Sequence, residues 1–103
     1  MSILEVAKVR VDPARTEEFE SAFADAIAFV RAAHGHRDSQ LTRVLETPGE
    51  YLFLVTWEDL ADHTERFTAS DGFRSFVAVL EPYFREAPEA VHVTTIIEKE
   101  NSK

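Results

Sequence analysis

Two side chains that could take part in chemistry lie six residues apart near the middle of this 103-residue sequence, Trp57 and His63. A tryptophan offers a large flat surface for an aromatic ligand and one N–H donor to orient it. His63 shares one side of a predicted short helix with Leu60, Thr64 and Phe67. A neutral histidine in that setting can take a proton from a phenolic hydroxyl. Each residue also has an ordinary structural interpretation, Trp57 as the end of the core and His63 as a histidine bonded to backbone at its edge.

Phenylalanines surround these two residues in the sequence and are candidates for the walls of a substrate pocket. The candidates are Phe53, Phe67 and Phe73. The helical spacing of Phe67, Phe73 and Phe76 is also what an ordinary hydrophobic core produces, and a core is the default interpretation.

The other histidines do not predict a metal site. His34 and His36 resemble half of one, but no third ligand is near in sequence, and a loop that ends a helix explains the pair equally well. His92 lies in the last predicted strand, and the sequence does not say which face of the sheet it occupies. We therefore expect no bound metal.

Composition excludes several classes of protein. The chain has no cysteine, which excludes disulfides, thiolate metal sites and thiol nucleophiles. Its formal net charge of −8 argues against nucleic acid and anionic membranes as partners. The three glycines show no phosphate-loop or dinucleotide spacing. With no leader segment, and no apolar run near the roughly 20 residues that a membrane helix needs, we expect a cytoplasmic protein.

The elements that must hold these side chains form one α+β domain, which we expect to span residues 1–103. Alternating residues predict strands, and helical spacing from Phe19 to Ala33 predicts a long helix. In order, we expect a strand over 3–11, a helix from Asp12 or Thr16 to Gly35, strands over 39–47 and 51–57, a short helix after Asp59, a helix over 73–80 and a strand over 91–98. This βαββααβ order predicts a ferredoxin-like fold, an antiparallel sheet with helices on one face.

The strand over 51–57 gives the strongest strand signal, because it is rich in aromatic and β-branched residues. Side chains alternate between faces, so one face carries Tyr51, Phe53, Val55 and Trp57, and the other carries Leu52, Leu54 and Thr56. Both faces are apolar, which is typical of a strand covered on both sides. The chain is too short for two layers of helix. We therefore expect its own helices on one face and a second copy of the protein on the other, as a homodimer.

With these elements in place, the chain resembles the antibiotic biosynthesis monooxygenase family, which are small dimeric α/β barrels. The residues that carry the resemblance are Val55-Thr56-Trp57-Glu58, Thr68-Ala69-Ser70-Asp71-Gly72-Phe73 and Leu80-Glu81-Pro82. The family includes oxygenases that act on polyphenols and quinols without metal or cofactor, and enzymes that degrade haem. The resemblance implies a homodimer whose sheets face each other, no cofactor, and a site between each sheet and its helices.

The resemblance also bears on single positions. Trp57 matches a tryptophan that lines the substrate site of the polyphenol oxygenases, and His63 matches a tyrosine that contacts substrate. Phe53 stands where they carry an asparagine thought to bind the substrate oxygen, and a phenyl ring cannot form that hydrogen bond. The haem-degrading branch needs an asparagine, a tryptophan and an iron-ligating histidine, and the matching positions here are Ala7, Phe67 and Val77. We therefore do not expect haem degradation.

Together these points predict a small monooxygenase that acts on an aromatic polyphenol or quinol without metal or flavin. Trp57 would orient the substrate, His63 would accept a proton, and Phe53, Phe67 and Phe73 would form the walls. The alternative is a non-catalytic dimer that binds a small aromatic metabolite or stabilises a partner. The loss of the asparagine at Phe53 favours this alternative.

Overall fold

A four-stranded antiparallel sheet forms one layer of the molecule in the computed structural model, which describes residues 2–99. Its strands are β1 (Ile3–Arg10), β2 (His36–Arg43), β3 (Glu50–Trp57) and β4 (Glu89–Val93). Their order across the sheet is β2-β3-β1-β4, so β1 lies between β3 and β4. This order and the helical layer on one face confirm the predicted α+β, ferredoxin-like fold.

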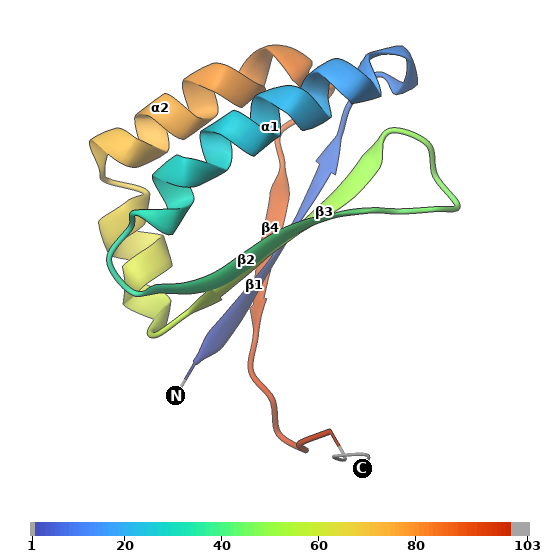
Figure 1. The fold of residues 1–103 in the computed structure, drawn as a ribbon. Helices are drawn as coiled ribbons and strands as arrows, with labels where there is room; N and C mark the ends of the chain where they lie inside the picture. Colours follow the sequence, from blue (N-terminus) through green and yellow to red (C-terminus); the bar gives the residue numbers. More distant parts are fainter. Residues whose placement is uncertain (1, 100–103) are drawn as a thin grey trace.

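The second layer consists of helices α1 (Thr16–Arg31) and α2 (Asp71–Leu80), which lie side by side over one face of the sheet (Figure 1). Three short helices connect the elements: η1 (Pro13–Arg15), η2 (Asp62–Phe67) and η3 (Glu81–Tyr83). Both predicted helix starts near residue 12 exist. Asp12 caps η1 by accepting a 2.9 Å hydrogen bond from the Ala14 amide, and α1 itself begins at Thr16.

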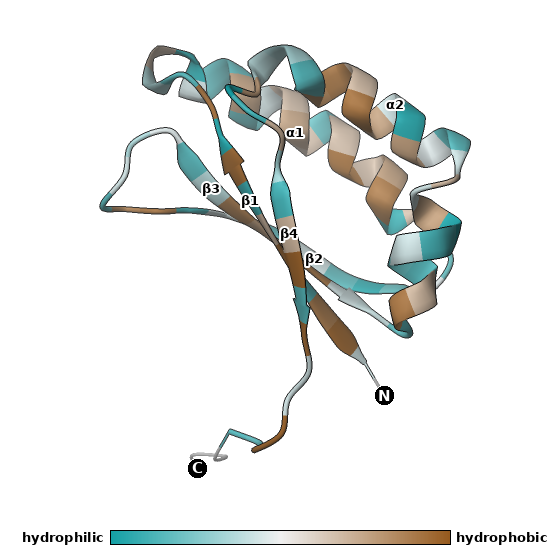
Figure 2. Cartoon of the chain, turned by 180° about the vertical axis from the view of Figure 1, so that it is seen from behind, coloured by the Kyte–Doolittle hydropathy of each residue, from teal (hydrophilic) through white to brown (hydrophobic). Residues whose placement is uncertain are grey.

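The core lies between the two layers. Tyr51, Phe53, Val55 and Trp57 are buried on the face of β3 that points toward the helices, as the alternation predicted. α1 supplies the opposing side chains, with Phe23 at 4.8 Å from Phe53 between ring centroids. Figure 2 shows hydrophobic residues recurring along both helices and along the strands that they cover.

Two strands differ from the prediction by more than one residue at both ends. β2 covers His36–Arg43 rather than 39–47, because Gly35 adopts a φ of +83° and lets pairing start at His36 opposite Trp57. The later residues form the hairpin loop, closed by a 2.9 Å bond from the Val44 amide to the Glu50 carbonyl. β4 covers Glu89–Val93 rather than 91–98, because β1 offers it partners only as far as Leu4. The predicted polar end of the chain, 100–103, lies outside the described residues.

Among residues 2–99 no helix lies over the other face of the sheet (Figures 1 and 2). By strand register, the aliphatic side chains on this face are Leu4, Val6, Leu52, Leu54, Val91 and Val93. Those on β1 and β3 are half-buried, whereas Val91 and Val93 are 59% and 45% exposed. This apolar surface is called the outer face below. No helix within residues 2–99 combines the length and apolar character needed to cross a membrane.

Candidate functional site

A cavity of about 720 Å³ lies between the sheet and the helices. The five residues predicted from sequence to form the site all line it: Phe53, Trp57, His63, Phe67 and Phe73. α2 explains why the space is open. Of its residues only Leu80 is fully buried, while Phe73 and Phe76 are half-buried because they face the cavity. The volume and the mostly apolar lining are those of a small-molecule site.

A buried carboxylate from the sheet lines this aromatic cavity beside Trp57. Glu5 lies on β1 and is 7% exposed, and its Oε1 accepts a 2.9 Å hydrogen bond from Nε1 of Trp57. Burial raises the pKa of the Glu5 carboxyl, and the Trp57 N–H offsets part of that rise by stabilising the charged form. Glu5 is therefore a stronger base, when ionised, than an exposed carboxylate.

His63 lies beside this carboxylate. Its ring stacks on Trp57, with centroids 5.5 Å apart and an interplanar angle of 16°. Its Nε2 is 3.5 Å from Oε2 of Glu5, which is too long for a strong hydrogen bond. Burial, together with the nearby His92, lowers the pKa of His63 to about 4. His63 is therefore uncharged at neutral pH, and the cavity contains an aromatic stack with a carboxylate at its edge.

His92 completes a chain of polar groups. β4 pairs with β1 so that His92 is opposite Glu5, and its Nε2 is 2.7 Å from Nδ1 of His63. One of these two nitrogens must donate. If His92 donates, His63 carries its proton on Nε2 and points it at Glu5; if His63 donates, its Nε2 is free to accept a proton. A proton can thus pass between Glu5 and His92 through a change of tautomer at His63.

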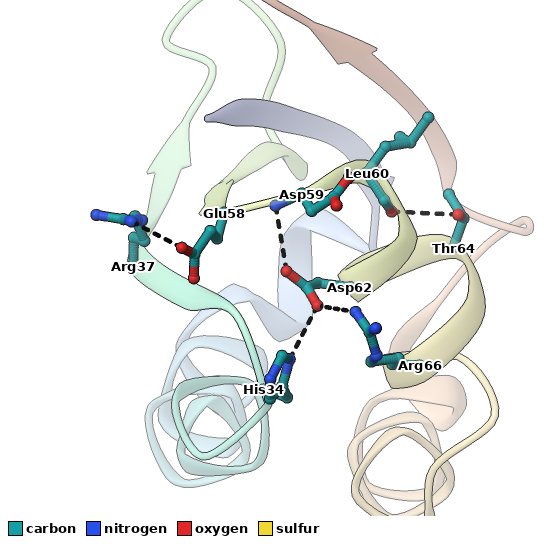
Figure 3. A network of polar contacts seen from close by, with 8 residues as sticks. All are labelled: His34, Arg37, Glu58, Asp59, Leu60, Asp62, Thr64 and Arg66. Atoms are coloured by element: carbon teal, nitrogen blue, oxygen red, sulfur yellow. Dashed lines mark hydrogen bonds and ion pairs between the residues drawn. The ribbon is translucent and has the colours of Figure 1, made fainter. Parts of the chain in front are cut away.

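A second network holds η2, and with it His63, in place (Figure 3). Asp62 is 2% exposed and accepts hydrogen bonds from His34 at 2.9 Å, from Arg66 at 2.5 Å and from the Asp59 amide at 3.1 Å. The bond from His34 contributes most to lowering the pKa of the Asp62 carboxyl. The network ties the loop after α1 to η2. We assign it a structural role, as a brace for the helix that carries His63.

Gly35 allows this brace to form, which gives a testable prediction. A Cβ at Gly35 would lie 2.0 Å from Oδ2 of Asp62, at a φ of +83° that other residues rarely adopt. We expect Gly35→Ala to lower the free energy of unfolding by about 3 kcal/mol in urea titrations, because strain and the lost network add. Gly72→Ala is the control, since a Cβ there meets no atom closer than 3.6 Å. Equal stability of the two variants would contradict this role for Gly35.

The lowered pKa of His63 predicts a pH dependence of stability. The unfolded chain binds a proton at this residue below about pH 6.5, whereas the folded chain does so only near pH 4. The contribution of His63 to the free energy of unfolding therefore falls as pH drops from 6.5 to 4, by up to about 3 kcal/mol. Glu5, with its raised pKa, acts in the opposite direction. Urea titrations at several pH values measure this dependence. In His63→Phe the free energy of unfolding should no longer fall between pH 6.5 and 4 on account of this residue. An unchanged pH dependence would contradict the burial of a neutral His63.

The structure separates the remaining histidines from the cavity. His34 belongs to the Asp62 network, and His36 contacts the Ser39 hydroxyl at 3.1 Å. Within residues 2–99 no three His, Cys, Asp or Glu side chains are grouped so that they could hold a metal ion.

Sequence reasoning missed Glu5 and His92 as members of the site. The signal for Glu5 was its place on the same strand face as Ala7 and Val9, because a carboxylate at an inward position needs a partner. His92 had no comparable signal, since its face depends on the pairing of β4 with β1. The short helix was predicted with Leu60 and Thr64 inward, but both are exposed. η2 has π-helical bonding, with the Thr68 amide bonded to the His63 carbonyl, and this wider turn directs only His63, Asp62 and Phe67 inward.

A ferredoxin-like sheet with an aromatic cavity beneath its helices defines a small α+β domain with a pocket of the size typical of small-molecule sites. The chain belongs to the antibiotic biosynthesis monooxygenase family, whose sequence profile matches residues 2–79. It is 31% identical to the Bacillus subtilis protein YczJ, described as uncharacterized, over 90 residues that cover 87% of this chain and 95% of that protein.

Several solved structures are similar over almost the whole chain. A crystal structure from Bordetella bronchiseptica that carries the name of the same family has a TM-score of 0.89 and 29% identity, and the match covers 93% of this chain and 98% of that one. SnoaB from Streptomyces nogalater, a cofactor-independent oxygenase, has a TM-score of 0.77 and 25% identity, with 94% and 95% covered. Membership of this family supports a monooxygenase-like role.

Proposed function

We propose that this protein is a monooxygenase that oxidises an aromatic polyphenol or quinol with molecular oxygen and without metal or flavin. The observation that carries the proposal is the Glu5–His63 pair at the edge of an aromatic cavity. The pair offers a proton acceptor where a phenolic hydroxyl could reach it. The likeness to SnoaB supports the absence of a cofactor from the reaction.

The proposed chemistry begins with a proton transfer. The substrate ring lies against Trp57 with a hydroxyl directed at Glu5, whose carboxylate takes the proton while the electron pair stays on the substrate oxygen. His63 passes the proton on toward His92 by exchanging tautomers. Oxygen then reacts with the electron-rich ring: one atom bonds to an activated ring carbon and becomes a carbonyl, and the other leaves as water with the hydrogen of that carbon and the phenolic proton. All the electrons come from the substrate.

The proposal refines the expected roles of the predicted residues. His63 alone is a weak base because its pKa is about 4, so Glu5 is assigned the proton and His63 the relay. Trp57 orients the ring and also holds the Glu5 carboxylate. Phe53, Phe67 and Phe73 serve as walls.

Oxygen uptake tests the proposal. Chelator-treated protein should consume oxygen with anthrone or 1,4-dihydroxynaphthalene faster than heat-denatured protein does. With ¹⁸O₂ and anthrone, one labelled atom should appear in the product. Uptake no faster than that of the denatured control across such a panel would contradict the proposal.

The runner-up is a non-catalytic protein that binds a small aromatic metabolite. It is favoured by Phe53, which packs against the rings of Phe23 at 4.8 Å and Phe76 at 5.9 Å and offers no polar side-chain group to a substrate oxygen. Saturable binding of an aromatic ligand with no turnover in air would support this alternative over the oxygenase.

We also propose that the single domain, residues 1–103, forms a homodimer through its outer face, giving a dimeric α/β barrel. Six aliphatic side chains on that face remain partly or largely exposed in one chain. Beyond β4 the chain runs away from its own helices, and Ile96 and Ile97 are 90% and 83% exposed. An exposed apolar surface that extends over three neighbouring strands, here β3, β1 and β4, is typical of a protein interface. A second copy would cover it.

A further inference from the structure

The charges around the cavity are all of one sign. Among the described residues that line it, the charged side chains are Glu5, Glu81 and Glu86, and no lysine or arginine is present. Of the described lining residues only His63 could carry a positive charge, and burial lowers its pKa so that it is neutral at pH 7. A ligand in this cavity therefore meets carboxylates and no counter-ion.

The acidic groups lie at both ends of the cavity. Glu5 faces it from β1 beside Trp57, whereas Glu81 and Glu86 face it from the segment that leads from α2 to β4. α2 ends at Leu80, so the negative end of its dipole also lies on the side of Glu81. A negatively charged group would therefore approach a carboxylate whichever way round the ligand binds.

Arg10, which contacts one of these carboxylates, does not compensate for their charge. Arg10 contacts Glu86 at 3.8 Å, but its Nε bonds to Glu50 at 3.2 Å, and it does not line the cavity. Glu81 has no ion pair among the interactions of residues 2–99. Taking an anion into an apolar site without a counter-ion is costly, and nearby like charges add to that cost.

We infer that the site selects uncharged aromatic compounds that carry a hydroxyl group, and that it rejects aromatic carboxylates. Glu5 is the residue that determines this specificity, since its carboxylate accepts a hydrogen bond from a ligand hydroxyl and repels a ligand carboxylate. The inference rests on the proposed function only in taking this cavity as the substrate site.

Binding of matched ligands tests the inference without requiring turnover. Calorimetric titrations at pH 7 with 2-naphthol and 2-naphthoate compare two molecules with the same ring system. The wild-type protein should bind 2-naphthol roughly 10- to 100-fold more tightly. Because Trp57 is the only tryptophan, quenching of its fluorescence reports binding at this cavity.

Glu5→Gln should lower the ratio of the two affinities several-fold, and the preference that remains reflects Glu81, Glu86 and the cost of taking an anion into an apolar site. Glu17→Gln removes the same charge from the exposed first turn of α1 and should leave the ratio unchanged. Equal or tighter binding of 2-naphthoate by the wild-type protein, no binding of either ligand, or a ratio unaffected by Glu5→Gln would overturn the inference. Selective binding of 2-naphthol without oxygen uptake would keep the inference and remove the oxygenase proposal, so the two can fail separately.

Discussion

Replacing Glu5 with glutamine is expected to lower kcat for a hydroquinone substrate by roughly 10²- to 10⁴-fold, which is the usual contribution of a positioned general base. The side chain keeps its size, and its amide oxygen can still accept the Trp57 N–H. The free energy of unfolding at pH 8 should therefore be unchanged or higher, because a neutral amide costs less to bury than a carboxylate. Oxygen uptake and urea titration on the same sample separate the loss of chemistry from a loss of folding.

The pH profile distinguishes a proton acceptor from a merely structural residue. Burial raises the pKa of Glu5, so kcat of the wild-type protein should increase as pH rises through that value and the carboxylate forms. Glu5→Gln should give a flat profile over the same range. Glu65→Gln removes a charge from an exposed position on η2 and should keep both rate and profile. A Glu5→Gln enzyme with the wild-type rate would rule out the carboxylate as the base.

A matched variant at His63 isolates the relay. His63→Phe keeps a flat ring against Trp57, 5.5 Å away in the native stack, but removes both nitrogens. We expect a smaller fall in kcat than for Glu5→Gln, because the carboxylate can still accept the proton while its path to His92 is broken. Wild-type turnover in His63→Phe would show that the proton leaves by another route.

The fold could be predicted because its signals are local. The alternation of side chains in β3 predicts which face of the strand packs against the helices. Asp12 and Gly35 mark the two ends of the α1 region, because a helix cap and a positive φ depend only on neighbouring residues. Such signals can be recognised in the sequence because each involves only a few neighbouring residues. The order of elements then restricts the topology to few choices.

The polar part of the site depends on contacts between residues that are far apart in the sequence, and no local sequence pattern predicts such contacts. Glu5 and Trp57 meet across 52 positions, and Glu5 and His92 meet only because β4 pairs with β1 in one particular register. Shifting that register by one residue would turn His92 to the outer face. The phenylalanines that line the cavity were predicted from residue type, spacing and the family resemblance, whereas Glu5, the carboxylate that carries the proposed chemistry, was not.

Leu54→Asp is expected to raise the dissociation constant of the proposed dimer roughly 1,000-fold or more, because two unpaired carboxylates would be buried across one interface. Leu54 lies at the centre of the outer face, opposite Val6 on β1, and is half-buried in one chain. It is not among the buried residues between sheet and helices, so the separated subunit should stay folded. Sedimentation velocity across a dilution series, with circular dichroism of the same samples, measures both quantities.

Val79→Asp provides the matched control, since Val79 is 38% exposed on α2, away from the outer face. It introduces the same charge and removes a similar side chain, and it should leave association unchanged. If the wild-type chain is a compact monomer at all concentrations, the outer face is not an interface between copies. If Leu54→Asp stays a dimer while Val79→Asp dissociates, the subunits meet through their helices instead, and the cavity beneath α2 would open toward the partner rather than toward solvent.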